Sequence, residues 1–170
     1  LLNSLAPLIP LGRLHLRPLQ LYLVSFRYNL RSQLEDPVPL REVWYKALMW
    51  WSDQPRLEIG VPLATPPPTV TLFTDASLTA WGASTLQRSA RGYWSPAEQG
   101  LHISILELRA VRLGLQALVS CLQGQTVRLM SDNISAIAYI RKEGGTKSVD
   151  LYCEVRDTLV WCQSQSIRLL

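Results

Sequence analysis

A change in the spacing of apolar residues near residue 69 divides the chain into an irregular first part and a regular second part. Three short segments of strand-type residues, TVTLFTDAS, WGASTLQ and RGYWS, follow one another with turn residues between them. Their close succession predicts an antiparallel meander. The apolar period then becomes that of one long helix over residues 102–122, which Gly124 ends.

The pattern continues as a compact apolar strand at residues 126–131 and a helix that opens with DNISAIAYIRKE. A GGT loop, a helix at residues 148–165 and a short strand at SIRLL complete it. The resulting order is β-β-β-α-β-α-α-β. It predicts an α/β fold in which a mixed five-stranded sheet, with its first three strands antiparallel, is flanked by helices.

Residues 1–68 contain ten of the eleven prolines, so long uninterrupted helices are not expected there. Residues 19–34 and 39–51 remain candidates for short helices, and the second is rich in tryptophan. We expect these tryptophans to pack on the following domain; stacking on nucleic acid is the alternative. The proline run at residues 66–68 predicts a stiff spacer. We therefore predict a connection segment over residues 1–68 and a domain over residues 69–170.

Composition narrows the classes of protein to consider. Apolar residues make up 48% and charged residues 18%, which argues against a disordered chain, and no apolar run is long enough to span a bilayer. A net charge of +4 permits nucleic-acid binding without demanding it. Three cysteines without a C-x-x-C pair indicate reduced, mostly buried thiols of an intracellular protein, cytoplasmic or nuclear. The first residue is Leu1 and the last four are IRLL, so we expect a piece of a longer protein.

Two carboxylates occupy positions that suggest chemistry. Asp75 ends the first strand, directly after Leu72 and Phe73, although aspartate is also common at the start of a turn. Glu107 lies on the apolar stripe of the long helix, opposite a polar face that carries two arginines. An unpaired carboxylate there costs several kcal/mol unless it is protonated or bound to metal. A salt bridge to a basic residue elsewhere is the alternative.

A third carboxylate, Asp132, follows the strand at residues 126–131 and precedes a helix. The usual role at that junction is to cap the helix, yet Asn133 could cap it equally well. Two strand-end aspartates and one inward glutamate can converge at one edge of a sheet. Such a group suits hard divalent ions such as Mg²⁺, and two of them about 4 Å apart would activate a water and stabilise a leaving phosphate-ester oxygen. The sequence contains no phosphate-binding glycine loop and no nucleophilic Ser-His or Cys-His pairing that would suggest a different chemistry.

Four segments in order resemble the ribonuclease H domain of retroelement reverse transcriptases, in particular those of DIRS-type elements: LFTDASLTAWGAS, LHISILELRAV, VRLMSDNISAIAYI and GGTKS. The resemblance covers residues 69–170, and the preceding ALMWW with its proline spacer is similar to the connection segment of the same polyproteins. It implies cleavage of the RNA strand of RNA–DNA hybrids with two Mg²⁺ ions, or with Mn²⁺. Asp75, Glu107 and Asp132 match the family's catalytic metal ligands.

By the same similarity, Ser77 and Asn133 contact the hybrid, and Lys147 contacts a phosphate, with a solvated loop lysine as the alternative for Lys147. The implied partners are an RNA–DNA hybrid and the polymerase domain of the same polyprotein, with no membrane and no small-molecule cofactor. The family's fourth aspartate and a histidine lie beyond Leu170, so we expect a C-terminally incomplete domain with slow or absent cleavage. A catalytically inactive module used for nucleic-acid binding or assembly is the alternative, although all three acids within the span are retained.

Overall fold

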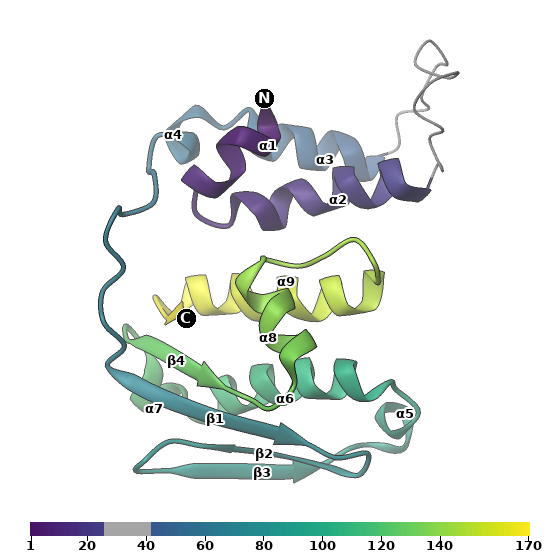
Figure 1. Cartoon of the computed structure of the whole chain (residues 1–170), viewed down its shortest axis with the longest axis vertical. Helices are drawn as coiled ribbons and strands as arrows, with labels where there is room; N and C mark the ends of the chain where they lie inside the picture. Colours follow the sequence, from purple (N-terminus) through teal and green to yellow (C-terminus); the bar gives the residue numbers. More distant parts are fainter. Residues whose placement is uncertain (26–41) are drawn as a thin grey trace.

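The computed structural model describes residues 1–25 and 42–170, and Figure 1 shows their arrangement. The strands are β1 (Val70–Ala76), β2 (Ala80–Ser84), β3 (Ser89–Tyr93), β4 (Thr126–Met130) and β5 (Arg168–Leu169). The longer helices are α2 (Gly12–Ser25), α3 (Glu42–Trp51), α6 (Ile103–Ala117), α8 (Ile134–Arg141) and α9 (Val149–Ser164). The short helices are α1 (Leu2–Leu5), η1 (Ala6–Leu8), α4 (Gln54–Leu57), α5 (Pro96–Gln99) and α7 (Val119–Leu122). None of the helices in these two described stretches has the length and apolar character needed to cross a membrane.

The five strands form one mixed sheet in the order β3-β2-β1-β4-β5. Strands β1, β2 and β3 pair antiparallel, whereas β4 is parallel to β1 and β5 is parallel to β4. Helices therefore connect the parallel strands, as the distance between their ends requires. This topology, a three-stranded meander continued by two parallel strands, is ribonuclease-H-like, and it confirms the fold class predicted from the sequence.

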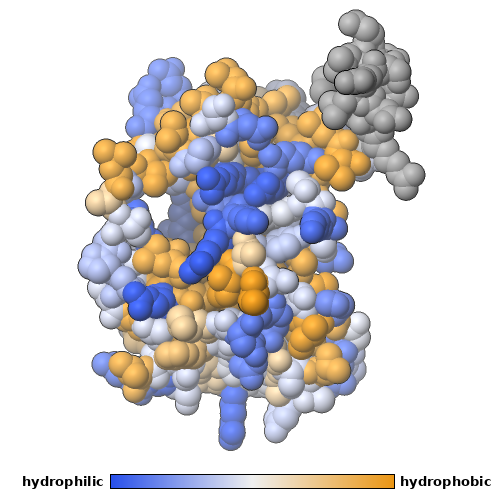
Figure 2. Space-filling view, in the orientation of Figure 1, coloured by the Kyte–Doolittle hydropathy of each residue, from blue (hydrophilic) through white to orange (hydrophobic). Residues whose placement is uncertain are grey.

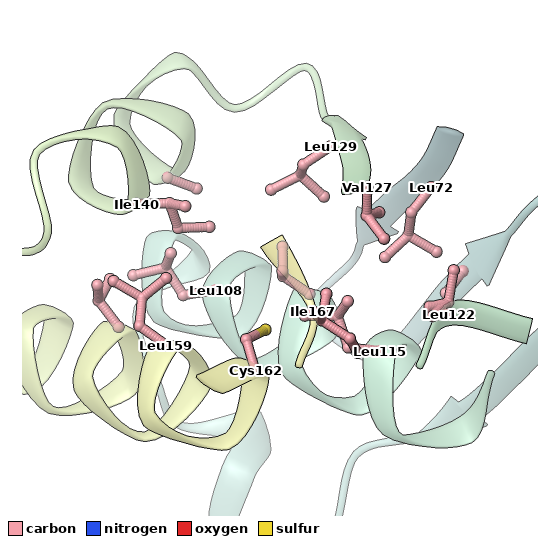
Figure 3. Packing of buried hydrophobic residues seen from close by; sticks show 14 of the residues in the cluster. Leu72, Leu108, Leu115, Leu122, Val127, Leu129, Ile140, Leu159, Cys162 and Ile167 are labelled. Carbon is pink, nitrogen blue, oxygen red and sulfur yellow. The ribbon is translucent and has the colours of Figure 1, made fainter. Parts of the chain in front are cut away.

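Helix α6 covers one face of the sheet. Side chains along β1 alternate, so that Leu72 and Thr74 are buried while Phe73 remains 45% exposed on the opposite face. Gly114 of α6 lies so close to β2 that a Cβ atom there would meet the Ala83 Cβ at 2.4 Å. The main core fills the space between the sheet, α6 and α9, and Figure 3 shows its leucine, valine and isoleucine side chains interdigitating around Cys162.

The N-terminal helices form a second layer beside α9 (Figure 1), with a small core of their own. Trp51 is buried in that core with Leu16 and Leu19, and Trp44 and Trp50 pack against it. The expectation that these tryptophans pack on the following domain is therefore wrong, because the preceding helix α2 supplies the apolar surface that they cover. Trp50 is stacked on His15, with their ring centroids 4.0 Å apart, and Arg56 lies over its ring. Figure 2 shows further hydrophobic groups on the outer surface of this layer.

Helix α2 differs from the candidate helix at residues 19–34, because it begins at Gly12 and contains Pro18. Residues 26–41, which include the end of the first candidate helix and the start of the second, lie outside the described residues. The second candidate, residues 39–51, ends at Trp51, as α3 does. Pro18 has no N–H to offer the carbonyl of Leu14, four residues earlier. The hydroxyl of Tyr152, from α9, donates to that carbonyl instead, at 3.4 Å. The proline is thus accommodated by a contact from the other layer.

Two further expectations need correction. The single helix predicted at residues 102–122 is two helices, α6 and α7, separated at Leu118, whose φ of −106° and ψ of 15° leave the helical range. Leu118 and Leu122 are both buried, so the break turns the chain and keeps the apolar positions in the core. Of the three free cysteines only Cys162 is buried; Cys121 and Cys153 are half-buried.

Candidate metal centre

The pairing of β1 with β4 places the two strand-end aspartates side by side. Phe73 is the partner of Met130 in this parallel pair. Two residues further along the chain are Asp75, still within β1, and Asp132, just beyond the end of β4, so both lie at the same edge of the sheet. Strand β4 ends at Met130, so the last residues of β1 have no strand beside them on that side. Both carboxylates are exposed there.

Glu107 approaches the same point from α6. Its side chain is only 4% exposed, between the fully buried Leu106 and Leu108. The opposite side of α6 carries Arg109 and Arg112, which pair with Glu154 of α9. Because of the helical periodicity, the two arginines of α6 point toward α9, whereas Glu107 points toward the ends of β1 and β4.

The three acids meet closely enough to share cations. Asp75, Glu107 and Asp132 each offer one carboxylate oxygen, and these oxygens all lie within 4.8 Å of one another. In the described part of the chain no ion pair involves Glu107, so the alternative of a salt bridge finds no partner there. Its Oε2 atom is buried without a hydrogen-bond partner. A buried, unpartnered oxygen beside two exposed carboxylates fits a site for hard divalent ions.

Burial and like charge raise the pKa of Glu107 to about 7. Loss of solvation is the larger cause, repulsion by Asp75 and Asp132 adds to it, and a hydrogen bond from the Ala76 backbone opposes it. In the absence of cations this carboxyl is therefore half protonated near neutral pH. A bound cation would remove the cause of the shift, because it compensates both the lost solvation and the repulsion.

The two structural roles considered for the aspartates, starting a turn and capping a helix, are filled by neighbouring residues. Ser77, and not Asp75, builds the turn after β1: its hydroxyl oxygen accepts hydrogen bonds from the backbone N–H groups of Thr79 and Ala80, at 3.2 and 3.0 Å. Asn133, and not Asp132, caps α8, because its side chain accepts a hydrogen bond from the N–H of Ala136 at 2.9 Å. Neither carboxylate is needed for the local backbone structure.

These roles bear on the residues suggested for nucleic-acid contact. Ser77 and Asn133 each lie within two residues of a carboxylate of the cluster, and their side chains also make the local hydrogen bonds just described. Lys147 is exposed in the loop between α8 and α9 and is not part of the carboxylate group. Beside the carboxylates lies an open depression of about 720 Å³ on the sheet face away from α6, lined by Phe73, Met130 and the two aspartates among others.

The sequence reasoning missed Trp94, which follows β3 and is buried against the start of α6. A signal was present in the chain: a lone tryptophan directly before Ser95-Pro96-Ala97-Glu98, which is a capping-box pattern. The structure contains that capping box at the start of α5.

Fold and site together define a ribonuclease-H-like domain with a three-carboxylate cluster suited to divalent cations. No family model matches the chain, and no curated protein matches it. A solved structure described as Prototype Foamy Virus Protease-Reverse Transcriptase (native) matches with 16% sequence identity and a TM-score of 0.43. The match covers 87% of this chain and 21% of that one, so the chain spans about a fifth of that protein's length.

Proposed function

We propose that the chain is the ribonuclease H region of a reverse transcriptase from a DIRS-type retroelement, which cleaves the RNA strand of RNA–DNA hybrids with Mg²⁺, or with Mn²⁺. The single observation that supports this most is the buried Glu107, whose Oε2 has no partner and whose carboxylate lies within 4.8 Å of those of Asp75 and Asp132. Bringing three carboxylates this close destabilises the fold, and among the described residues none of them has an ion-pair partner that would offset this cost. A bound cation would offset it.

In this proposal Asp75, Glu107 and Asp132 hold the cations at the open end of the sheet. Bound cations would supply a water of lowered pKa and a counter-charge for the leaving oxygen. The residues of the chain fix the geometry. The end of β1 and the start of the β4–α8 connection present the exposed carboxylates of Asp75 and Asp132 to a phosphodiester. Helix α6 contributes the buried carboxylate of Glu107. RNA is selected through its 2′-hydroxyl groups across a shallow minor groove.

The partners proposed are an RNA–DNA hybrid and the polymerase domain of the same polyprotein. Within the chain, residues 1–68 would act as the connection segment and residues 69–170 as the nuclease. Ser77 and Asn133 would approach the hybrid beside the carboxylates, and Lys147 would contact a backbone phosphate from the α8–α9 loop. A modest positive charge favours such phosphate contacts.

The test is a single-turnover assay with the chain in excess over labelled RNA–DNA hybrid, RNA duplex and DNA duplex, in Mg²⁺ and in Mn²⁺. We expect slow cleavage of the RNA strand of the hybrid alone. Asp132→Asn removes a charge at nearly constant volume and should abolish the cleavage. Glu58→Gln, in the connection segment, removes one charge far from the carboxylates in sequence and should leave it intact.

Titration of the metal separates the two functional readings. Mg²⁺ binding followed by calorimetry should be lost in Asp75→Asn. Cleavage that persists undiminished in Asp132→Asn would exclude this mechanism. Because slow or absent cleavage is expected of residues 1–170 alone, hybrid binding without cleavage favours a non-enzymatic, nucleic-acid-binding module only if Mg²⁺ binding is absent as well.

A further inference from the structure

Trp94 connects the two elements that carry the first two carboxylates. It lies just after β3 and is 3% exposed. Its indole N–H donates to the carbonyl of Ser77 at 2.8 Å, and its backbone N–H donates to the carbonyl of Thr79 at 2.9 Å. Both acceptors belong to the turn that directly follows β1. Trp94 therefore holds this turn from the side of the third strand.

The ring of Trp94 also packs against the beginning of α6. It shares a small core with Leu106 and Ala110, and Ala76 packs against the same group. Ala76 is the neighbour of Asp75 in the chain, and Leu106 is the neighbour of Glu107. The small core that contains Trp94 thus includes residues next to both carboxylates, although the carboxylates come from elements about 30 residues apart.

The backbone that Trp94 fixes also contacts the site directly. The N–H of Ala76 donates a hydrogen bond to the carboxyl of Glu107. The next residue, Ser77, presents its carbonyl to the Trp94 indole. Ser77 is therefore held by Trp94, while the preceding residue, Ala76, orients the buried carboxyl group of Glu107.

We propose that Trp94 is a positioning residue for the metal centre: it sets the separation between Asp75 and Glu107 by tying the β1–β2 turn to α6. This inference rests on the proposed function, since it assumes that the carboxylates bind cations. Loss of the indole N–H would leave the Ser77 carbonyl unpaired and free the turn to move relative to α6. Partners that orient metal ligands in this way contribute strongly to affinity.

The test compares two tryptophan variants by Mn²⁺ titration of the full chain, followed by calorimetry and by the electron paramagnetic resonance of free Mn²⁺. Trp94→Phe keeps an aromatic ring and removes the N–H; it should weaken Mn²⁺ binding about five- to tenfold. Trp81→Phe is the matched control. Trp81 lies on β2 opposite Ala76 and packs against the same small core, but among the described residues its indole N–H makes no hydrogen bond. Its replacement should leave the affinity within about twofold.

A measurement on the unmodified chain covers the case in which Trp94→Phe does not fold. Adding Mg²⁺ should shift the indole N–H resonance of Trp94 together with the amide of Ala76. The indole of Trp51, which donates to the His15 carbonyl in the N-terminal layer, should not shift and serves as the internal reference. An Ala76 shift without a Trp94 shift would overturn the inference.

The outcomes also separate this inference from the function on which it rests. If the unmodified chain binds no Mn²⁺, the proposed function fails. If it binds Mn²⁺ and Trp94→Phe binds equally well, even with a lowered melting temperature, Trp94 is merely structural and only the positioning role is wrong.

Discussion

Replacing Glu107 by glutamine should stabilise the metal-free protein at pH 8 while removing its response to metal. The pKa of Glu107 rises from 4.5 to about 7 on folding, so the folded state binds this proton more tightly than the unfolded state. Stability from this group is therefore present at low pH and is lost as the pH rises toward 7. At about 1.4 kcal/mol per pH unit, the ionised carboxylate costs the fold about 3 kcal/mol at pH 8 and under about 1 kcal/mol at pH 5.

Glutamine removes that cost without removing the side chain. Its amide oxygen can still accept the Ala76 N–H, and its amide N–H groups face the Asp75 and Asp132 carboxylates as donors. We expect Glu107→Gln to raise the melting temperature by roughly 5 to 10 °C at pH 8 in chelator, and by much less at pH 5. Added Mg²⁺ should raise the melting temperature of the parent chain and leave that of the variant unchanged.

A second buried glutamate provides the control with the opposite sign. Glu154 is 7% exposed, similar to Glu107, but it is paired with Arg109 and Arg112. Glu154→Gln leaves Arg112 with a neutral partner and Arg109 with Glu98 as its remaining ion pair, and should destabilise the fold by about 1 to 3 kcal/mol. Scanning calorimetry or thermal unfolding followed by circular dichroism measures both variants. A Glu107→Gln variant that is destabilised at pH 8, or that keeps the pH dependence of the parent chain, would refute the reasoning.

Two further outcomes follow from the same structure. Mg²⁺ affinity should rise about tenfold between pH 6 and pH 8, because Glu107, with a pKa of about 7, must lose its proton to bind metal; a flat calorimetric profile over this range contradicts the assignment. Leu14→Ala should destabilise the chain by about 2 to 4 kcal/mol in urea denaturation, since Leu14 is fully buried in the main core. Leu23→Ala, at an exposed position of the same helix, should cost under about 0.5 kcal/mol, and equal losses would contradict this account.

The sequence was sufficient for the second half of the fold because its signals are local. The apolar periods of β1, β4 and α9 each match one element, and the placement of Glu107 on the apolar stripe followed from helical geometry alone. The break at Leu118 was missed because apolar residues continue through it, so the periodicity contains no interruption. Trp94 was missed because its role depends on a turn from another strand, which no spacing within its own segment reveals.

The first part of the chain shows the limit of local reasoning more sharply. Proline counts predicted only short helices there, yet α2 runs through Pro18. The reason is a contact between the layers: the Tyr152 hydroxyl donates to the Leu14 carbonyl that the proline leaves free, and the Glu143 carboxylate accepts the Leu14 N–H at 3.2 Å. Both backbone groups of one residue are thus bonded to the α8–α9 region, and its side chain enters the main core. A helix-breaking residue is tolerated where the rest of the fold supplies the missing donor. Helix α2 is therefore joined by hydrogen bonds to the α8–α9 region, which follows Asp132 in the chain.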